Sequence, residues 1–100
     1  MNTSRVRYHQ GATEDVKSAT IWYLGRSLKA AQDFVEELDR AVNTILEAPE
    51  RWPMGESNAR RFLLWRFPFS VIYSEHEGGI VIWAVAHSSR RPEYWTRRVK

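Results

Sequence analysis

The last third of the chain places polar and cationic side chains directly after an apolar run. The run extends from Ile80 to Ala86, and five residues that could do chemistry follow it closely: His87, Arg90, Arg91, Tyr94 and Trp95. Histidine can move protons near neutral pH, and the arginine guanidinium binds phosphate or carboxylate through two parallel hydrogen bonds. The pattern indicates a site for an anionic substrate or partner at the end of a sheet strand.

The charge of the chain is divided unequally between its halves. Residues 1–50 carry six Lys/Arg and eight Asp/Glu, a net of −2, and residues 51–100 carry nine Lys/Arg and four Asp/Glu, a net of +5. Eight of the nine basic residues in the second half are arginine, which suits planar contacts to phosphate or carboxylate. A nucleic acid or an acidic protein would suit this half, and a solvated basic surface is the alternative.

A strand and a first helix are expected in the N-terminal quarter. Ser4 to His9 alternates polar and apolar residues, as a short strand does, and Gly11 breaks the pattern. The first helix is expected to begin at Thr13, with two acids in the first turn facing the helix dipole, and to end around Gly25.

The second helix has the clearest pattern in the sequence. Its apolar residues follow the i, i+3, i+4, i+7 spacing of one helical face: Ala31, Phe34, Val35, Leu38, Ala41, Val42, Ile45 and Leu46. The other face is expected to carry the charged residues Asp33, Glu36, Glu37, Asp39 and Arg40. Pro49 ends the helix, and the loop from Glu50 to Ala59 follows.

Three strands are expected after this loop, over Arg60–Arg66, Phe69–His76 and Ile80–His87. The last is apolar on both faces, which is typical of a central strand. The expected fold is therefore a single α+β domain over residues 1–100, in the order β-α-α-β-β-β. It comprises an N-terminal strand, an αα-hairpin and a three-stranded antiparallel meander, with the helices on one face of the sheet.

The hairpin between the last two strands predicts a register. If Gly78-Gly79 forms a two-residue turn, Tyr73 faces Ala84 and Ser70 faces His87. Ser70 and His87 would then lie side by side at one end of the sheet, whereas a one-residue slip would place them on opposite faces.

Three segments of the second half carry a family resemblance. They are Arg60 to Tyr73, with its Phe-Pro-Phe-Ser-Val-Ile-Tyr phrase, then Ile82 to His87, and Arg90 to Trp95, with its Arg-Arg-Pro-Glu-Tyr-Trp phrase. These segments resemble the RelE/ParE superfamily of toxins from type II toxin–antitoxin modules. The family shares the order of strand, helical hairpin and three strands, so the resemblance covers nearly the whole chain and implies a RelE/ParE-like fold.

The resemblance implies a growth-inhibiting toxin that a cognate antitoxin neutralises in a hetero-oligomeric complex. RelE-like members cleave messenger RNA on the ribosome without a metal, and ParE-like members inhibit DNA gyrase. Ser70 and Leu63 stand where RelE-like members carry basic residues, which favours gyrase inhibition without enzymatic activity. The alternatives are a ribosome-dependent endoribonuclease, and an inactive toxin that acts only in the antitoxin complex.

The resemblance also suggests roles for individual residues. Catalysis, if present, would fall to four of them, with Arg61 at a family basic position and Tyr94 near the family's C-terminal tyrosine: Arg61, His87, Arg90 and Tyr94. Contacts to a partner or nucleic acid are expected from Arg60, Arg66, Arg91 and Trp95. The structural alternatives are that His87 only completes a strand end, and that Tyr94 and Trp95 only hold the C-terminal segment against the sheet.

Several other classes of protein are not indicated. The chain has no cysteine, and its three histidines lack the spacing of a metal site, so no cofactor is expected. It has no phosphate-binding glycine loop and no apolar run long enough for a membrane span. The first ten residues lack the apolar core of a signal peptide, and a cytoplasmic protein is expected.

Overall fold

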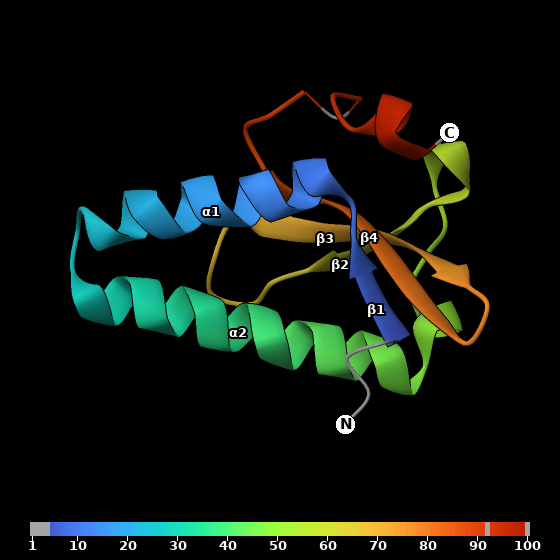
Figure 1. Ribbon diagram of the computed structural model, residues 1–100, viewed down its shortest axis with the longest axis horizontal. Helices are drawn as coiled ribbons and strands as arrows, with labels where there is room; N and C mark the ends of the chain where they lie inside the picture. The colour runs from blue at the N-terminus through green and yellow to red at the C-terminus, as the bar shows by residue number, and fades with distance from the viewer. Residues whose placement is uncertain (1–4, 92, 100) are drawn as a thin grey trace.

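The computed structural model describes residues 5–91 and 93–99 and shows a four-stranded sheet packed against two antiparallel helices (Figure 1). The elements are β1 (Val6–Tyr8), α1 (Gln10–Leu24), α2 (Leu28–Glu47), β2 (Arg60–Leu63), β3 (Phe69–His76) and β4 (Gly79–His87). A short 3-10 turn, Thr96–Val99, follows. Of the predicted segments, Ser4 of the first strand and Pro92 of the C-terminal motif lie outside the described residues.

The sheet has the order β1-β4-β3-β2. β1 pairs with β4 in parallel, and β2, β3 and β4 form the expected antiparallel meander. β4 is therefore a central strand, as its apolar sequence predicts. The α+β fold class and the order of elements are confirmed.

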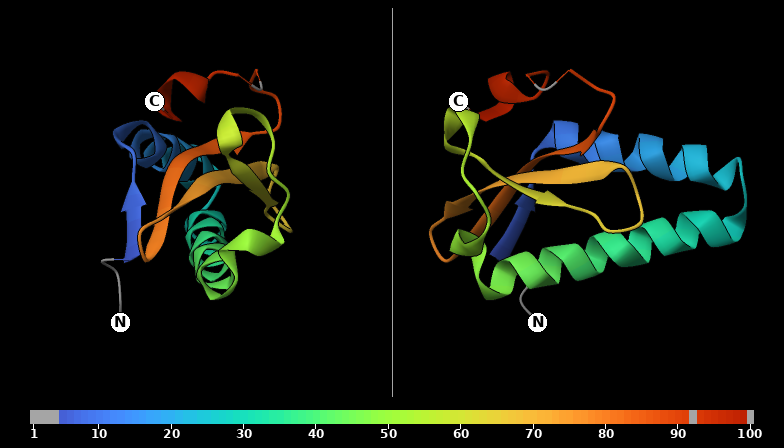
Figure 2. Two further views of the ribbon diagram at one scale, coloured as in Figure 1. Left: turned by 90° about the vertical axis from the view of Figure 1, so that its right-hand side faces the viewer. Right: turned by 180° about the vertical axis from the view of Figure 1, so that it is seen from behind.

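The sheet is covered on both faces (Figure 2). One face packs against the helices, in a core that includes Phe34, Ile45, Val71, Tyr73 and Ile82. The C-terminal segment covers the other face, in a smaller core of Ala59, Ile72, Ala84, Ala86 and Trp95. We call these the helical face and the tail face.

The apolar stripe of α2 is confirmed, with one important exception. Ser27 caps the helix, since its Oγ accepts a hydrogen bond of 3.0 Å from the Ala30 N–H, and the helix ends just before Pro49. The prediction that Glu37 lies on the exposed polar face is wrong, because only 7% of Glu37 is exposed.

The predicted start of α1 at Thr13 is one turn late. The helix begins at Gln10, and the Nδ1 atom of His9 accepts a hydrogen bond of 2.9 Å from the Gly11 N–H. Gly11 thus lies inside the helix rather than breaking it. The glycine at this position leaves room for a distant side chain, because the Arg98 guanidinium lies where a Cβ at Gly11 would be. The predicted first-turn acids are consequently in the second turn.

The predicted β2 strand is three residues too long. It ends at Leu63 because the next segment turns toward α2, where Glu37 accepts hydrogen bonds from the Trp65 and Arg66 N–H groups. The chain re-enters the sheet at Phe69.

The predicted register of the β3–β4 hairpin is wrong. Gly79 belongs to β4 and pairs with His76, so the turn is Glu77-Gly78, and only Gly78 has a positive φ, 77°. A bulge at Trp83 partly compensates for the shift, and Ser70 pairs with Ala86 while Phe69 pairs with His87. Position 79 must be glycine, because the parallel pairing of β1 places the Arg5 backbone so close to it that a Cβ would collide.

Candidate functional site

The residues predicted to form one site lie on two faces of the sheet. Arg61 pairs with Ile72, and the Arg61 Nη1 donates a hydrogen bond of 3.2 Å to Ser70 Oγ, so both belong to the tail face. His87 lies opposite Phe69, whose ring packs against Phe34 on the helical face. The one-residue slip in register therefore separates His87 from Ser70 and Arg61.

His87 completes a turn at the end of β4. Its ring is perpendicular to that of Phe69, with centroids 5.0 Å apart. Its Nδ1 accepts a hydrogen bond of 2.9 Å from the Ser89 N–H and lies 2.8 Å from Ser89 Oγ. Accepting from a backbone N–H requires an unprotonated Nδ1, which assigns the proton of the neutral ring to Nε2. This geometry fits the structural alternative for His87.

Tyr94 is held by a cluster that joins the C-terminal segment to α1. Its hydroxyl donates a hydrogen bond of 3.1 Å to Asp15, and the Arg98 guanidinium donates to the same Asp15 oxygen at 2.9 Å. Burial, followed by the negative charge of Asp15, raises the pKa of Tyr94 to about 12. The Arg90 guanidinium lies 3.7 Å from the centre of the Tyr94 ring. A phenol so engaged is poorly suited to proton transfer near neutral pH.

Arg61 and Trp95 line the same hollow on the tail face. The hollow has a volume of about 290 Å³, and its walls also include Met54, Ala59 and Ile72. The Arg61 side chain is exposed there, whereas Trp95 is only 4% exposed and packs in the tail-face core. Trp95 thus holds the C-terminal segment against the sheet, and Arg61 remains the accessible cation of this hollow.

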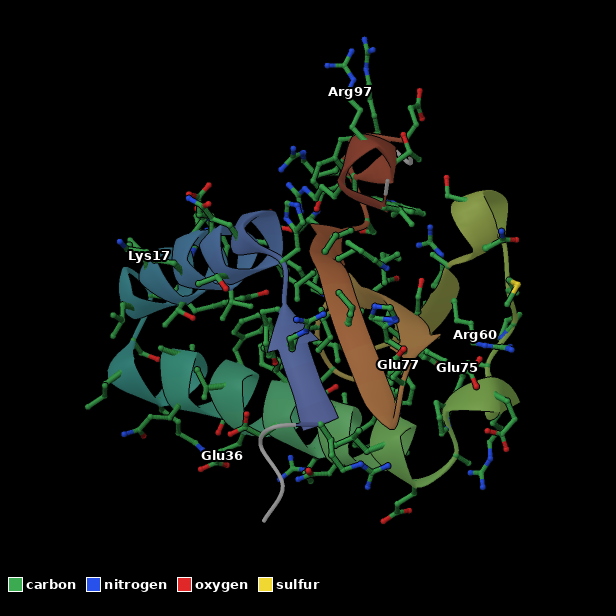
Figure 3. The ribbon with its side chains drawn as sticks, turned by 45° about the vertical axis from the view of Figure 1, so that its right-hand side comes forward. Lys17, Glu36, Arg60, Glu75, Glu77 and Arg97 are labelled. Atoms are coloured by element: carbon green, nitrogen blue, oxygen red, sulfur yellow. The ribbon has the colours of Figure 1, made fainter. Side chains whose placement is uncertain are left out.

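The other predicted arginines differ in their freedom to bind a partner. Arg60 is fixed by a 3.2 Å ion pair with Glu75 and a 2.7 Å hydrogen bond to the Trp52 carbonyl; Figure 3 shows Arg60 and Glu75 close together. Arg66 forms a 3.0 Å ion pair with Glu37 but leaves nearly half of its side chain exposed. Arg91 is exposed beyond β4.

Glu37 is the residue that sequence reasoning misplaced. Besides the two N–H groups of Trp65 and Arg66, it binds the Arg66 guanidinium. Burial alone would raise the pKa of Glu37, but the hydrogen bonds from Arg66 and Trp65 outweigh burial and lower this pKa. The available signal was its spacing, three residues after Phe34 and four before Ala41, which places it beside the apolar stripe.

The Glu37 anchor shapes a groove between α2 and β2. The groove has a volume of about 260 Å³ and is lined by Arg40, Ala41 and Thr44 on one side and by Phe62, Leu63 and Trp65 on the other. Leu63 is 70% exposed and Trp65 is 89% exposed. Glu37 binds the Trp65 backbone N–H, yet the Trp65 ring lies almost entirely in solvent, and such an exposed tryptophan is unusual on a protein surface. We call this surface the α2–β2 groove.

Comparisons with family models and solved structures identify the family of the chain. A family model described as the ParE toxin of the type II toxin–antitoxin system parDE matches residues 6–92. The chain belongs to the ParE toxin family. A solved structure, the chromosomal ParDE TA system from P. aeruginosa, is similar with a TM-score of 0.68 and 17% identity, over 82% of this chain and 92% of that chain. At this identity the likeness concerns the fold. No curated protein matches the chain.

Among the side chains that the structure describes, no group of three or more His, Cys, Asp or Glu residues is arranged to hold a metal ion. A hollow of about 400 Å³ lies at the β3–β4 turn, away from the predicted site residues. Within the described part of the chain, no helix has the length and apolar character needed to cross a membrane.

Proposed function

We propose that this ParE-family toxin inhibits growth by binding DNA gyrase and that a cognate antitoxin neutralises it in a cytoplasmic hetero-oligomer. The observation that carries the proposal is the separation of the residues expected to cleave RNA. His87 lies on the opposite face of the sheet from Arg61, and the Tyr94 hydroxyl is engaged with Asp15. An acid and a base that act on one bond must both reach it, and this arrangement supports inhibition by binding.

RNA cleavage is the second candidate, because three of the predicted arginines remain exposed. Arg61, Arg90 and Arg91 are all exposed and could contact phosphates. Two other positions count against this chemistry. Ser70 is buried and accepts from Arg61, so it offers no phosphate grip, and Leu63 has no group to transfer a proton.

The α2–β2 groove is the surface that best suits the antitoxin. An amphipathic segment could place apolar side chains on Leu63 and Trp65, and carboxylates near the exposed guanidinium groups of Arg40 and Arg66. A segment that orders on binding can follow such a groove over a long path. The net charge of +5 in the second half of the chain also favours an acidic partner.

Two measurements on the toxin expressed alone separate the candidate activities. Purified toxin should inhibit gyrase supercoiling and produce gyrase-dependent DNA breaks, without cuts in translated messenger RNA. His87→Ala should retain this inhibition, because the His87 ring is engaged locally with Ser89 and Phe69 at the end of β4. Codon-phased messenger RNA ends, without an effect on gyrase, would reject the proposal in favour of RNA cleavage. Normal growth with neither effect would favour the inactive toxin.

Coexpression with the neighbouring reading frame tests the antitoxin. The product should bind the toxin and restore growth, and Trp65→Ala should weaken binding at least tenfold, since exposed tryptophans are frequent hot spots. Met54→Ala is the matched control, because Met54 is another exposed apolar residue but lies outside the groove. Equal antitoxin affinity for the wild type and Trp65→Ala would place the antitoxin elsewhere.

A further inference from the structure

The joined ends of α1 and α2 project beyond the sheet (Figures 1 and 2). Four large apolar side chains are exposed there, between 49% and 63% of each: Ile21, Trp22, Leu24 and Leu28. Together with Lys17 and Arg26 they form a surface that we call the hairpin tip. Exposed apolar side chains that gather in this way mark interaction surfaces more often than isolated ones do.

The hairpin tip is attached to the core through Tyr23 and Ser27, and Trp22 adds an edge-to-face contact with Tyr23, with ring centroids 5.0 Å apart. Tyr23, between Trp22 and Leu24, points inward and packs against Phe34 and Phe67, with ring centroids 5.3 Å and 5.1 Å away. The Ser27 cap starts α2 directly after the connection. The fold is therefore held at this end by Tyr23 and Ser27, and the outward apolar residues remain available to a partner.

The hairpin tip is also positively charged, although it belongs to the half of the chain with a net negative charge. Residues 16–32 contain Lys17, Arg26 and Lys29 and no Asp or Glu, although residues 1–50 carry a net charge of −2. Lys29 pairs with Asp33 at 3.3 Å. Lys17 is exposed on α1, where Figure 3 labels it, and the Arg26 guanidinium lies 4.2 Å from the centre of the Trp22 ring. The surface thus combines a Trp–Arg pair with the exposed cation of Lys17.

We infer that the hairpin tip docks into an acidic-rimmed apolar depression on the target, which is DNA gyrase under the proposed function. The shape of the two apolar surfaces distinguishes their partners. The α2–β2 groove is hollow and suits an extended segment, whereas the hairpin tip protrudes and suits a depression on a folded protein. Tryptophan and arginine at the centre of a contact are the residues that most often dominate its affinity. Complementary charge would speed the encounter and fix its orientation.

Variants of exposed residues test this inference without disturbing the core. Trp22→Ala and Arg26→Glu should each lower gyrase inhibition by roughly tenfold or more, and Arg26→Lys should restore most of it if an acidic rim is the partner. Val35→Ala is the matched control, because Val35 is exposed on α2 outside the hairpin tip. Antitoxin affinity should change less than twofold in every variant. Urea unfolding verifies that each variant is folded.

The outcomes separate this inference from the function on which it rests. If the wild type does not inhibit gyrase, the proposed function fails, and the inferred target with it. If the wild type and Trp22→Ala inhibit gyrase equally, only the inference fails. Loss of antitoxin binding in Trp22→Ala would overturn it by assigning the hairpin tip to the antitoxin. If the wild type forms a dimer that Trp22→Ala dissociates, the hairpin tip binds a second copy of the chain and the inference is overturned. If the wild type binds anionic vesicles and Trp22→Ala does not, the hairpin tip binds lipid and the inference is overturned.

Discussion

Asp15 of α1 and Arg98 of the C-terminal 3-10 turn, 83 positions apart in the chain, form an ion pair of 2.9 Å with little exposure of either side chain. The same Asp15 oxygen accepts from the Val85 N–H at 3.1 Å and from Tyr94, so it joins α1, β4 and the C-terminal segment. Arg98 also donates to the Trp83 carbonyl at 2.9 Å. This pair fixes the segment that covers the tail face.

Asp15→Ala should destabilise the toxin by about 3 kcal/mol, because it removes the counter-charge of Arg98 and the side-chain acceptor of the Val85 N–H in a largely buried place. Urea unfolding followed by tryptophan fluorescence measures the change. Arg97→Ala is the control: Arg97 is adjacent but exposed, and its loss should change stability by about 0.5 kcal/mol or less. Similar midpoints for both variants would mean that the pair contributes little.

Glu37 predicts a specific dependence of stability on pH. Its pKa is lower in the folded state than in the unfolded chain, so the unfolded chain binds more protons as the pH falls. The stabilisation from Glu37 is therefore complete above its ordinary pKa of about 4.5 and is lost as the pH falls through the lower folded value. Glu37→Gln should cost about 2–3 kcal/mol at pH 7, and this difference from the wild type should shrink at low pH.

Unfolding in urea between pH 3 and pH 7 measures this difference. Glu36→Gln is the matched control, because Glu36 is the exposed neighbour on α2, as Figure 3 shows. A constant gap between the wild type and Glu37→Gln across this range would contradict the role assigned to the carboxylate.

The local patterns of the sequence were sufficient to predict the helices and the strands. The spacing from Ala31 to Leu46 predicts the buried stripe of α2, and the apolar run from Ile80 to Ala86 predicts a central strand. Both patterns report burial along one element, which depends on neighbours in sequence. The register and the site depend on other contacts. β4, for example, also pairs with β1, about seventy residues earlier, through Val6 and Ile80, and no local pattern reports that contact.

The same distinction explains the individual site residues. Asp15 and Glu37 look like ordinary helix-surface acids, and only the distant Arg98 and Arg66 make them structural. Ile21 and Trp22 show the reverse case: their apolar side chains on a helix suggest burial, but more than half of each residue is exposed. Sequence spacing gives the direction of a side chain on its own helix. It does not give the position at which the neighbouring sheet ends.

Two adjacent glycines should respond differently to alanine. Gly79→Ala should cost about 3 kcal/mol, because the new Cβ would meet the Arg5 backbone and separate β1 from β4. Gly78→Ala should cost only about 1–2 kcal/mol, from its φ of 77°, since nothing lies near its Cβ position. Gly55→Ala, with open space and no positive φ, should be nearly neutral. Chemical unfolding of the three variants gives the order, and equal losses at Gly78 and Gly79 would contradict the parallel pairing of β1.

Tyr94→Phe separates a structural tyrosine from a catalytic one. The Phe ring keeps the contact with Arg90 but removes the hydrogen bond to Asp15, so stability at pH 7 should fall by about 1 kcal/mol. Folding raises the pKa of Tyr94 to about 12, so its contribution is complete below about pH 10 and is lost as the pH rises through 12. Tyr94→Phe should therefore lose less stability than the wild type between pH 9 and pH 12 in urea unfolding. Growth inhibition should stay within about threefold of the wild type, whereas a proton-transferring phenol would give a loss of at least about a hundredfold.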